Sequence, residues 1–312
     1  MAKAQKHRGP TPRARVSEPT RTRQRRIGWL AWLAVGLLAA GGAFWVAKEQ
    51  ATGGGEAIAP PAKGLPATPD YHSLLVDAAN PNRVFLGTHV GVYESTDGGV
   101  TWRFAGLKGK DAMHFARVDE GTIWTAGHDV LEKSEDAGHT WTEVRPEGLP
   151  GLDVHGFAVS PKDGTVYAAI AGEGLYRSTD GGKNFGLVSA EVGPGVTALA
   201  VSNDGALFAA DGERGVLVNA GGDGRRWTQT LNMATIGLAS NALESPRDRM
   251  LAAGETVQLR TDEAGWETVL RVEDGAGPVA FAPSDPDIAY AVGFDRTLYR
   301  SEDGGRSWSP VG

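Results

Sequence analysis

The sequence contains no cysteine, so disulfide bonds are excluded and the folded part of the chain must gain its stability from packing. Positive charge is also scarce beyond the N-terminal tail. Residues 1–26 carry nine Lys or Arg and one acid, whereas the whole chain of 312 residues has a net charge of −7. The remaining residues therefore carry a net charge of about −15. This acidic balance argues against nucleic acid as a partner, because phosphate groups repel an acidic surface.

One long uncharged apolar run is present, at residues 27–47 (IGWLAWLAVGLLAAGGAFWVA). As a helix, this run is long enough to cross a hydrocarbon core of about 30 Å, so we expect a retained transmembrane signal anchor. The basic residues 1–26 cannot form a core and are expected to be disordered and cytoplasmic, which places the rest of the chain outside the cytoplasm. Gly41 and Ala43 leave a cleaved signal peptide as the alternative.

Two further regions follow the apolar run. Residues 48–70 are rich in Gly, Ala and Pro and poor in large apolar side chains, which is typical of a flexible tether. Residues 71–312 are repetitive, with aromatic landmarks at intervals of 39, 44, 42, 39 and 42 residues. The landmarks are Trp102, Trp141, Phe185, Trp227, Trp266 and Trp308. A period near 40 in a chain of short strands predicts the blades of a β-propeller.

Each repeat contains four short runs of Val, Ile, Phe, Tyr and Leu, separated by Gly, Asp and Pro. Six such units predict an all-β, six-bladed propeller of four-stranded blades over residues 71–312. The last run, WSPVG, completes the sixth unit, so no strand is left over to join the last blade to the first. We therefore expect the ring to close by packing between blades.

An octapeptide motif recurs in four of the units, with the pattern Ser-x-Asp-x-Gly-x-x-Trp or Phe. Its members are Ser95, Asp97, Gly99 and Trp102; Ser134, Asp136, Gly138 and Trp141; Ser178, Asp180, Gly182 and Phe185; and Ser301, Asp303, Gly305 and Trp308. The pattern suits a tight turn between third and fourth strands: Asp accepts backbone N–H groups, Gly adopts positive φ, and the aromatic ring anchors the returning strand. A catalytic group would be needed once and not in every blade, so we interpret the motif as structural. The fourth unit has Gly222 at the Asp position, and the fifth is one residue short between Asp262 and Trp266.

The motif resembles the Asp-box, or BNR, repeat of sialidase-type, sortilin-type and photosystem II assembly-factor propellers, over roughly residues 71–312. Other residues resemble a group of bacterial membrane-anchored BNR proteins described as glycosyl-hydrolase-like. These residues are His72, Thr88, His89, Gly91, Met113, Gly127, His128, Asp153 and His155. The first resemblance implies the propeller fold, and the second raises glycoside hydrolysis as an alternative function.

Five of the seven histidines occupy positions that the repeat does not demand. They are His72, His114 and His155 at the start of a first strand, and His89 and His128 in the turn between second and third strands. Because strands alternate in direction, both kinds of position belong to the face opposite the motif turns. In the last three units, Thr197, Gly237 and Val279 lie near the start of the first strand, where the first three units have histidine. The expected neighbours of the histidines are Met113, Asp111, Asp129, Asp153, Tyr71 and Glu173.

Imidazoles that converge on one face are typical of a transition-metal site for Zn, Cu or Ni, of a proton-transfer centre, or of a pocket for a sugar or an anion. The five histidines, with Met113, Asp111, Asp129 and Asp153, are therefore our candidates for ligand or metal binding. The alternative is that each histidine merely caps a strand or bonds to a neighbouring loop.

The function that these features favour is a membrane-tethered, extracytoplasmic binding module or scaffold that contacts a protein or glycan through its histidines. A typical sialidase is disfavoured, because the Arg-Ile-Pro that the resemblance would require is absent and Tyr93, Tyr176 and Tyr299 fit blade packing.

Two alternatives stay open. A glycoside hydrolase would need an acid pair in the funnel, drawn from Asp111, Asp129, Asp153 or Glu173. A photosystem-type assembly factor would predict a basic patch, which the scattered Arg145, Arg225 and Arg226 do not clearly form.

Overall fold

The structure is a computed structural model of the chain that describes residues 60–192, 195–241, 248–261 and 264–312. The predicted tail, the predicted transmembrane segment and most of the predicted tether lie outside these residues. The described residues form strands joined by turns. Among them, no helix has the length and apolar character needed to span a bilayer.

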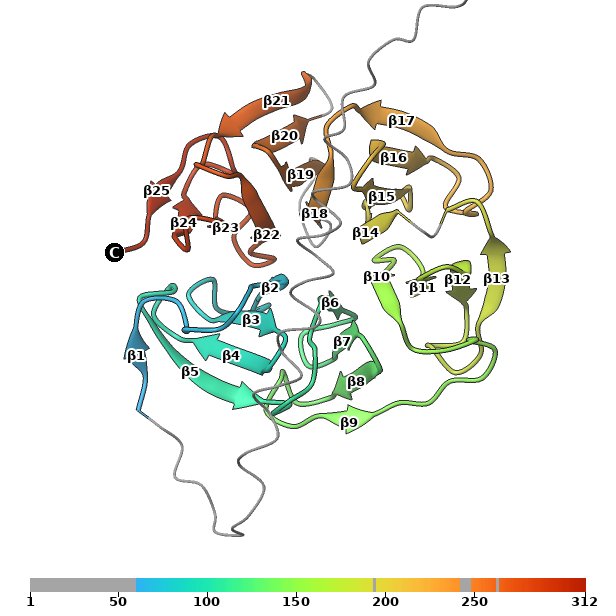
Figure 1. Ribbon diagram of the computed structural model, residues 1–312, viewed down its shortest axis with the longest axis horizontal. Helices are drawn as coiled ribbons and strands as arrows, with labels where there is room; N and C mark the ends of the chain where they lie inside the picture. Colours follow the sequence, from blue (N-terminus) through green and yellow to red (C-terminus); the bar gives the residue numbers. More distant parts are fainter. Residues whose placement is uncertain (1–59, 193–194, 242–247, 262–263) are drawn as a thin grey trace, which may run out of the picture. The chain divides into compact units, whose positions relative to one another are not determined.

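Six antiparallel sheets are arranged in a ring, and each is built from consecutive strands with the first strand innermost (Figure 1). The first three blades contain β2 (Ser73–Val76), β3 (Val84–Thr88), β4 (Gly91–Ser95) and β5 (Thr101–Gly106); β6 (His114–Arg117), β7 (Ile123–Gly127), β8 (Val130–Ser134) and β9 (Thr142–Glu143); and β10 (Val154–Val159), β11 (Val166–Ile170), β12 (Gly174–Ser178) and β13 (Gly186–Ser189). The last three contain β14 (Val196–Val201), β15 (Leu207–Asp211), β16 (Gly215–Asn219) and β17 (Thr228–Leu231); β18 (Thr235–Ser240), β19 (Arg249–Gly254), β20 (Val257–Thr261) and β21 (Gly265–Leu270); and β22 (Ala276–Phe281), β23 (Ala289–Gly293), β24 (Leu298–Ser301) and β25 (Ser309–Pro310). The predicted six-bladed all-β propeller is confirmed.

The second strand of a blade is the most deeply buried, because the neighbouring blades cover both of its faces. Every residue of β3 (VFLGT), β11 (VYAAI) and β23 (AYAVG) is buried. A strand that is covered on both faces has no solvent side, so its sequence reads as a continuous run of small and apolar residues. The outermost strands β5 and β13 carry exposed residues instead.

The ring closes by side-chain packing between the first and sixth blades. Leu298 of β24 belongs to one buried cluster with Leu86 and Trp102 of the first blade. The Tyr290 hydroxyl also donates a hydrogen bond of 2.9 Å to the carbonyl O of Pro81. Within the described residues, the sixth sheet contains no strand from the first blade, as the sequence predicts.

A short additional strand, β1 (Ala62–Lys63), pairs with β5 at the outer edge of the first blade. Residues 62–63 fall in the segment predicted as tether, so the end of that segment packs on the propeller. Arg296, in the turn between β23 and β24, holds the same segment at a second point by donating to the carbonyl O of Thr68 at 3.1 Å. The attachment was not visible in the Gly/Pro/Ala-rich composition, because two residues of backbone pairing need no particular side chains.

The octapeptide motifs form the predicted turns between third and fourth strands. In the first blade the Ser95 hydroxyl donates to Asp97 Oδ1 at 2.8 Å and accepts the N–H of Gly99 at 2.8 Å. Asp97 Oδ1 then accepts the N–H of Thr101 at 2.9 Å. The same three contacts recur around Asp136, Asp180 and Asp303. Gly99 has φ of 93°, so the predicted need for positive φ is confirmed.

The fourth unit keeps the turn by a different route from the one that its alignment suggests. Asn219 takes the place of the serine and accepts the N–H of Gly224 at 3.0 Å. Asp223, one residue beyond Gly222, accepts the N–H of Arg225 at 3.0 Å. The Trp227 indole donates to the carbonyl O of Gly224 at 2.9 Å, as Trp102 does to Gly99 in the first blade. The carboxylate is therefore present after a one-residue insertion, which a fixed-spacing motif cannot detect.

Candidate functional site

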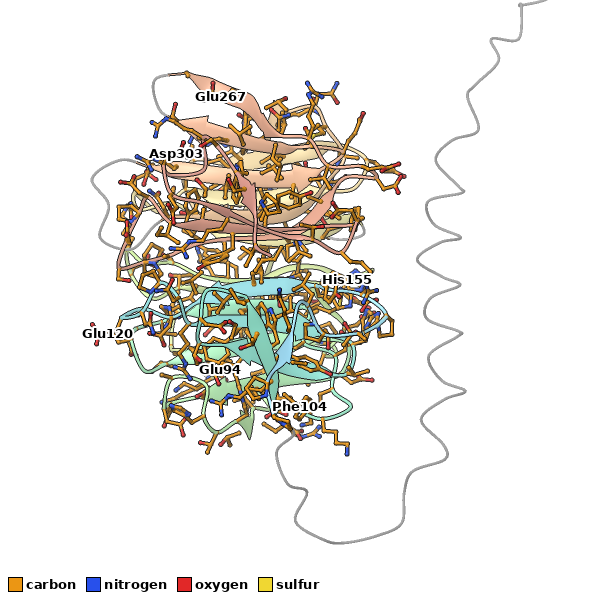
Figure 2. The ribbon with its side chains drawn as sticks, turned by 90° about the vertical axis from the view of Figure 1, so that its left-hand side faces the viewer. Glu94, Phe104, Glu120, His155, Glu267 and Asp303 are labelled. Atoms are coloured by element: carbon orange, nitrogen blue, oxygen red, sulfur yellow. The ribbon has the colours of Figure 1, made fainter. Side chains whose placement is uncertain are left out.

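The His-rich face is the side of the propeller that carries the starts of the first strands and the turns between second and third strands. His72 directly precedes β2, His114 opens β6, and His155 is the second residue of β10, whereas His89 and His128 lie in the β3–β4 and β7–β8 turns. Figure 2 shows His155 on the side of the molecule opposite the motif residue Asp303.

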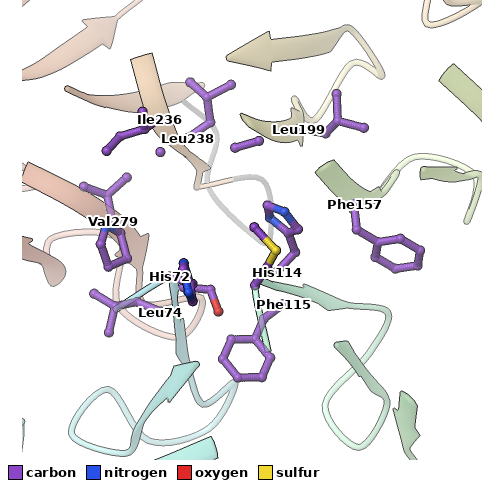
Figure 3. A pocket seen from close by; sticks show the side chains of 14 residues that line it. His72, Leu74, His114, Phe115, Phe157, Leu199, Ile236, Leu238 and Val279 are labelled. Carbon is purple, nitrogen blue, oxygen red and sulfur yellow. The ribbon is translucent and has the colours of Figure 1, made fainter. Parts of the chain in front are cut away.

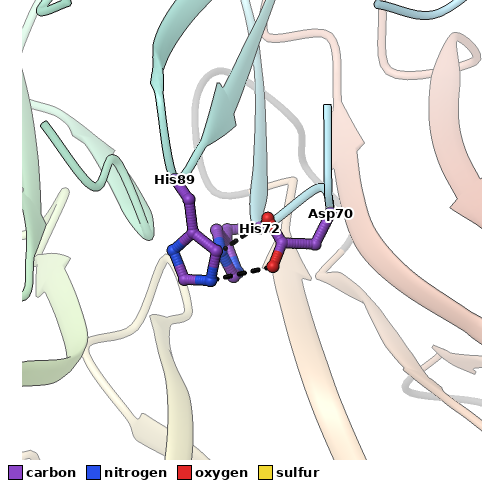
Figure 4. Close-up of side chains that lie close together, drawn as sticks. All are labelled: Asp70, His72 and His89. Carbon is purple, nitrogen blue, oxygen red and sulfur yellow. Dashed lines mark ion pairs between the residues drawn. The ribbon is translucent and has the colours of Figure 1, made fainter. Parts of the chain in front are cut away.

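The first group of side chains on this face consists of Asp70, His72 and His89 (Figure 4). Asp70 Oδ2 lies 2.8 Å from His89 Nε2, and Asp70 Oδ1 lies 3.2 Å from His72 Nε2. The His72 and His89 rings meet edge to face, with their centroids 4.2 Å apart. Asp70 Oδ1 and His72 Nε2 are buried, and although they lie close together, neither has a hydrogen-bond partner among the described residues.

The second group consists of His128, Asp153 and His155. His128 Nε2 lies 3.2 Å from His155 Nε2 and 3.4 Å from Asp153 Oδ1. His155 Nε2 lies 3.2 Å from the same carboxylate oxygen. All three side chains are partly open to solvent, with exposed fractions of 46% for His128, 55% for Asp153 and 33% for His155.

Asp111 connects the two groups. Its Oδ2 lies 2.8 Å from His89 Nδ1 and 2.9 Å from His128 Nδ1. A carboxylate accepts hydrogen bonds at both positions, so the Nδ1 atoms carry the protons and the Nε2 atom of each ring is directed into its own group. Imidazoles and carboxylates therefore alternate without interruption across the first three blades.

The backbone places these side chains with little freedom. His128 and Asp153 form an isolated antiparallel bridge between the second and third blades. His155 is the extra residue of a β-bulge at the start of β10, where the pairing of Val154 is followed by that of Gly156. Bulges redirect a side chain away from the regular alternation, which here turns His155 toward His128.

Two glycines bring the Asp111 segment close to the second strands. A Cβ on Gly127 would lie 2.1 Å from the carbonyl O of Asp111, and a Cβ on Gly87 would lie 2.2 Å from the carbonyl O of Ala112. Neither approach is compatible with a side chain. The glycines at the ends of β3 and β7 therefore allow the carboxylate to reach both imidazoles.

The alternating charges shift the ionisation of the network. The hydrogen bonds that His89 donates to Asp111 and then to Asp70 raise the pKa of His89 to about 10, so this ring is a cation at neutral pH. Its hydrogen bond with Asp111 likewise raises the pKa of His128. Burial raises the pKa of Asp111 and of Asp70, but the hydrogen bonds with the imidazoles outweigh burial and hold both pKa values well below the ordinary range. Burial lowers the pKa of His155, which favours the neutral ring.

His114 and Met113 line a cavity of about 60 Å³ at the centre of the ring (Figure 3). His72 and Val279 lie on one side of the same cavity, and Ile236 lies across it from His114. Desolvation lowers the pKa of His114 to about 3, and its buried Nε2 has no hydrogen-bond partner among the described residues. His114 is therefore a neutral ring in the cavity wall and is separate from the contacts of the other four histidines.

Not every expected neighbour belongs to the network. Asp129 is exposed in the β7–β8 turn, with φ of 56°, and the ion pairs around His128 do not include it. Glu173 is also exposed, in the β11–β12 turn. Tyr71 donates to the carbonyl O of Pro66 at 2.7 Å and lies below the Arg296 guanidinium, so it belongs to the ring closure. Asp70 was missed because it ends the predicted tether, although an acid two residues before His72 was a usable signal.

Two of the corresponding positions in the other half of the His-rich face hold exposed apolar side chains, whereas others hold Thr197 and the exposed Glu255. Ile236 occupies the bulge of β18 that corresponds to His155 in β10, and Phe294 follows β23 as His128 follows β7. Both side chains are exposed, at 38% and 50%. Ile236, and not the neighbouring Gly237, is thus the counterpart of His155. The histidine–carboxylate network therefore lies on one half of the face, and the exposed apolar side chains of Ile236 and Phe294 lie on the other.

The profile of the family described as photosynthesis system II assembly factor YCF48 matches residues 70–311. The photosystem II assembly lipoprotein Ycf48 of Synechococcus sp. (strain CC9902) is 25% identical over 266 residues, which cover 81% of this chain and 79% of the lipoprotein. A probable oligoxyloglucan-reducing end-specific xyloglucanase of Neosartorya fischeri is 22% identical over 288 residues, which cover 77% of this chain and 34% of that enzyme.

Two solved structures share the fold. The GH74 xyloglucanase from Xanthomonas campestris superposes with a TM-score of 0.54 at 19% identity, covering 80% of this chain and 47% of the enzyme. A structure of YCF48 bound to D1 peptide superposes with a TM-score of 0.51 at 18% identity, covering 80% of this chain and 83% of that one. The chain thus spans about a third and about half of the xyloglucanases that it matches. The expected relation to Asp-box propellers is confirmed.

Proposed function

The chain belongs to the family of photosynthesis system II assembly factor YCF48, and we propose that it is a membrane-tethered propeller outside the cytoplasm that binds a protein partner through its His-rich face. The observation that carries this proposal is the placement of the non-repeating side chains. The motif turns recur around the ring on one face, whereas the charged network and the exposed Ile236 and Phe294 lie on the other.

A polypeptide is the ligand class that fits such a face. Ile236 and Phe294 offer exposed apolar side chains on one half of the face, and Ile236 also lines the central cavity. The network on the other half offers imidazole and carboxylate groups that can pair with backbone or polar side chains. The structure of YCF48 bound to D1 peptide, although only 18% identical, supports a peptide as a ligand for a propeller of this kind.

The tether is the second part of the proposal. Residues 27–47 form the single long apolar run, and the basic tail precedes it, which favours a cytoplasmic N-terminus. The described chain then starts at the outer edge of the first blade, where β1 pairs with β5.

Glycoside hydrolysis is less well supported at this site. A general acid must be protonated near neutral pH, which requires a raised pKa. Asp111 and Asp70 have lowered pKa values because they lie between imidazoles. Both are therefore anions that orient histidines, and neither suits the role of the acid.

Site-specific photo-crosslinking tests the proposal. A photoreactive phenylalanine analogue at position 294 of the full-length chain, in membranes of the source cells, is expected to give a discrete protein adduct. Position 187 is the matched control, because Leu187 is similarly exposed, at 55%, but lies on the outer strand β13. Equal adducts at both positions, or none at position 294, would overturn the proposal.

A further inference from the structure

We infer that His128, Asp153 and His155 form a binding site for a divalent transition-metal ion of the zinc class on the His-rich face. The inference deepens the proposed function, because the ion would lie on the surface that binds the partner. It rests on the positions of three atoms: His128 Nε2, His155 Nε2 and Asp153 Oδ1.

These three atoms form a nearly equilateral triangle with edges of 3.2, 3.4 and 3.2 Å. Two ligand atoms held tetrahedrally at about 2.0–2.1 Å from a zinc ion lie about 3.3 Å apart. The triangle therefore has the dimensions of one face of a zinc coordination tetrahedron.

Hydrogen bonding alone does not account for all three edges. Each Nε2 carries at most one proton and the carboxylate carries none, so two linear hydrogen bonds can satisfy at most two of the contacts. A metal ion satisfies all three atoms at once, because each offers it a lone pair. Two imidazoles and one carboxylate are a ligand set that suits zinc and its neighbours in the first transition series.

The surroundings of His128 have the features of an outer coordination shell. Asp111 Oδ2 accepts from His128 Nδ1 at 2.9 Å, which fixes the ring with Nε2 turned toward Asp153 and His155. Carboxylates hold metal-bound histidines in this way in many zinc sites. The backbone bridge between His128 and Asp153, and the hydrogen bond from Ala171 N–H to the carbonyl O of Asp153 at 2.9 Å, keep the ligands in place.

The fourth coordination position faces solvent. Asp153 and His128 are about half exposed, so solvent reaches the triangle. Open coordination positions accept water or a donor group from another molecule. A carboxylate or imidazole of a bound polypeptide could complete the tetrahedron, which would couple metal binding to partner binding.

The group of Asp70, His72 and His89 is the weaker candidate. His89 Nε2 is already paired with Asp70 Oδ2 at 2.8 Å, while His72 Nε2 lies nearest the other oxygen of the same carboxylate. His89 also bonds to Asp111 through Nδ1. Its contacts are those of an ion-paired imidazolium, which stabilises the carboxylates beside the metal site.

The test is a titration of the EDTA-stripped full-length protein, in detergent and purified with a tag that lacks histidine, with Zn²⁺ in competition with a chromophoric chelator. One zinc ion is expected per chain, and Co²⁺ is expected to give the intense visible absorption of a tetrahedral site. His155→Ala should abolish saturable binding, and Asp111→Asn should weaken it about 10- to 100-fold. Circular dichroism and thermal unfolding establish that each variant is folded.

Two variants serve as controls. His139→Ala removes an exposed histidine of the second motif turn and should leave zinc binding unchanged. His72→Ala should also retain the zinc stoichiometry, because it alters the other group. Absent or sub-stoichiometric binding in the parent, binding that persists in folded His155→Ala, or loss only in His72→Ala would overturn the inference.

The two proposals can fail separately. Zinc binding is measured on the purified protein with the metal alone, whereas partner binding is measured by crosslinking at position 294. Crosslinking without zinc binding would support the partner-binding face and overturn the metal site. Zinc binding without crosslinking would support the metal site and overturn the partner-binding face.

Discussion

At the residue scale, Asp111 and the glycines beside it explain why the network exists. One carboxylate oxygen meets two imidazole Nδ1 atoms from different blades, which requires its backbone to lie against the ends of β3 and β7. Gly87 and Gly127 leave room for that approach. A small residue at the end of a buried strand is ordinary in sequence, yet here it sets the position of a functional carboxylate.

Substitution of Gly127 tests this packing. Gly127→Ala should lower the free energy of unfolding by about 1–3 kcal/mol, because the new Cβ would lie 2.1 Å from the carbonyl O of Asp111 and the segment would have to shift. Urea unfolding followed by tryptophan fluorescence measures the change. Gly151→Ala is the matched control, since a Cβ there meets no atom within 4 Å. Equal stability of the two variants would contradict the steric argument.

The motif carboxylates predict a pH dependence of stability. Burial raises the pKa of Asp303, but the hydrogen bonds from Ser307 and Ser301 outweigh it and lower the pKa to about 2. A carboxylate with a lowered folded-state pKa stabilises the fold above its unfolded pKa of about 4, and this contribution disappears as the pH falls toward 2. The stability difference between the wild type and Asp303→Asn should therefore be full at pH 6 and shrink below pH 4.

Thermal unfolding at several pH values measures that difference. Glu302→Gln is the control, because its side chain is 74% exposed and lies 3.5 Å from Arg300 in a surface ion pair. A gap between wild type and Asp303→Asn that stays constant down to pH 3 would show that the carboxylate charge is not what stabilises the turn.

At the element scale, the ring holds together because each blade packs its buried strands against the next. Leu298 of β24 shows this at the closing seam, where it lies in one cluster with Leu86 and Trp102 of the first blade. A Cβ on Gly99 would lie only 2.0 Å from the Leu298 side chain, so the turn glycine also makes room for the neighbouring blade.

Leu298→Ala should cost about 2–5 kcal/mol of unfolding free energy, the range for removing a fully buried leucine side chain. Leu187→Ala removes the same atoms from an exposed position on β13 and should cost far less. Chemical denaturation provides both values. If the two substitutions were equally mild, closure by packing at this seam would be wrong, and polar contacts across it, such as the hydrogen bond from Tyr290 to Pro81, would have to hold the ring.

At the scale of the whole molecule, the absence of native cysteine makes the proposed orientation directly measurable. A single cysteine introduced by Glu120→Cys lies on the propeller surface, and one introduced by Ser17→Cys lies in the N-terminal tail. A membrane-impermeant maleimide should label the first variant at the outer face of the intact cytoplasmic membrane, and the second only after permeabilisation. The wild type supplies the background. The opposite pattern, or release of the protein from the membrane fraction, would contradict a tethered extracytoplasmic propeller.

Most of the architecture followed from the sequence because propeller blades are local structures. A period near 40, four apolar runs per unit and a turn motif with fixed hydrogen-bond requirements each depend on residues close together in the chain. The placement of the histidines on one face also followed, since strand direction alternates. The fourth turn contains equivalent hydrogen bonds, although an inserted residue shifts Asp223 away from the position that the motif predicts.

The sequence by itself therefore determined the all-β propeller, its blade count, the face that carries the histidines and the closure without a shared strand. Only the tertiary structure decided which histidines meet. His128, Asp153 and His155 form a triangle because a bulge, a bridge between two blades and Asp111 act together, and His114 is separated from them by its place in the cavity wall. These contacts require separate segments of the chain to be positioned to within a few tenths of an ångström, which no local pattern encodes.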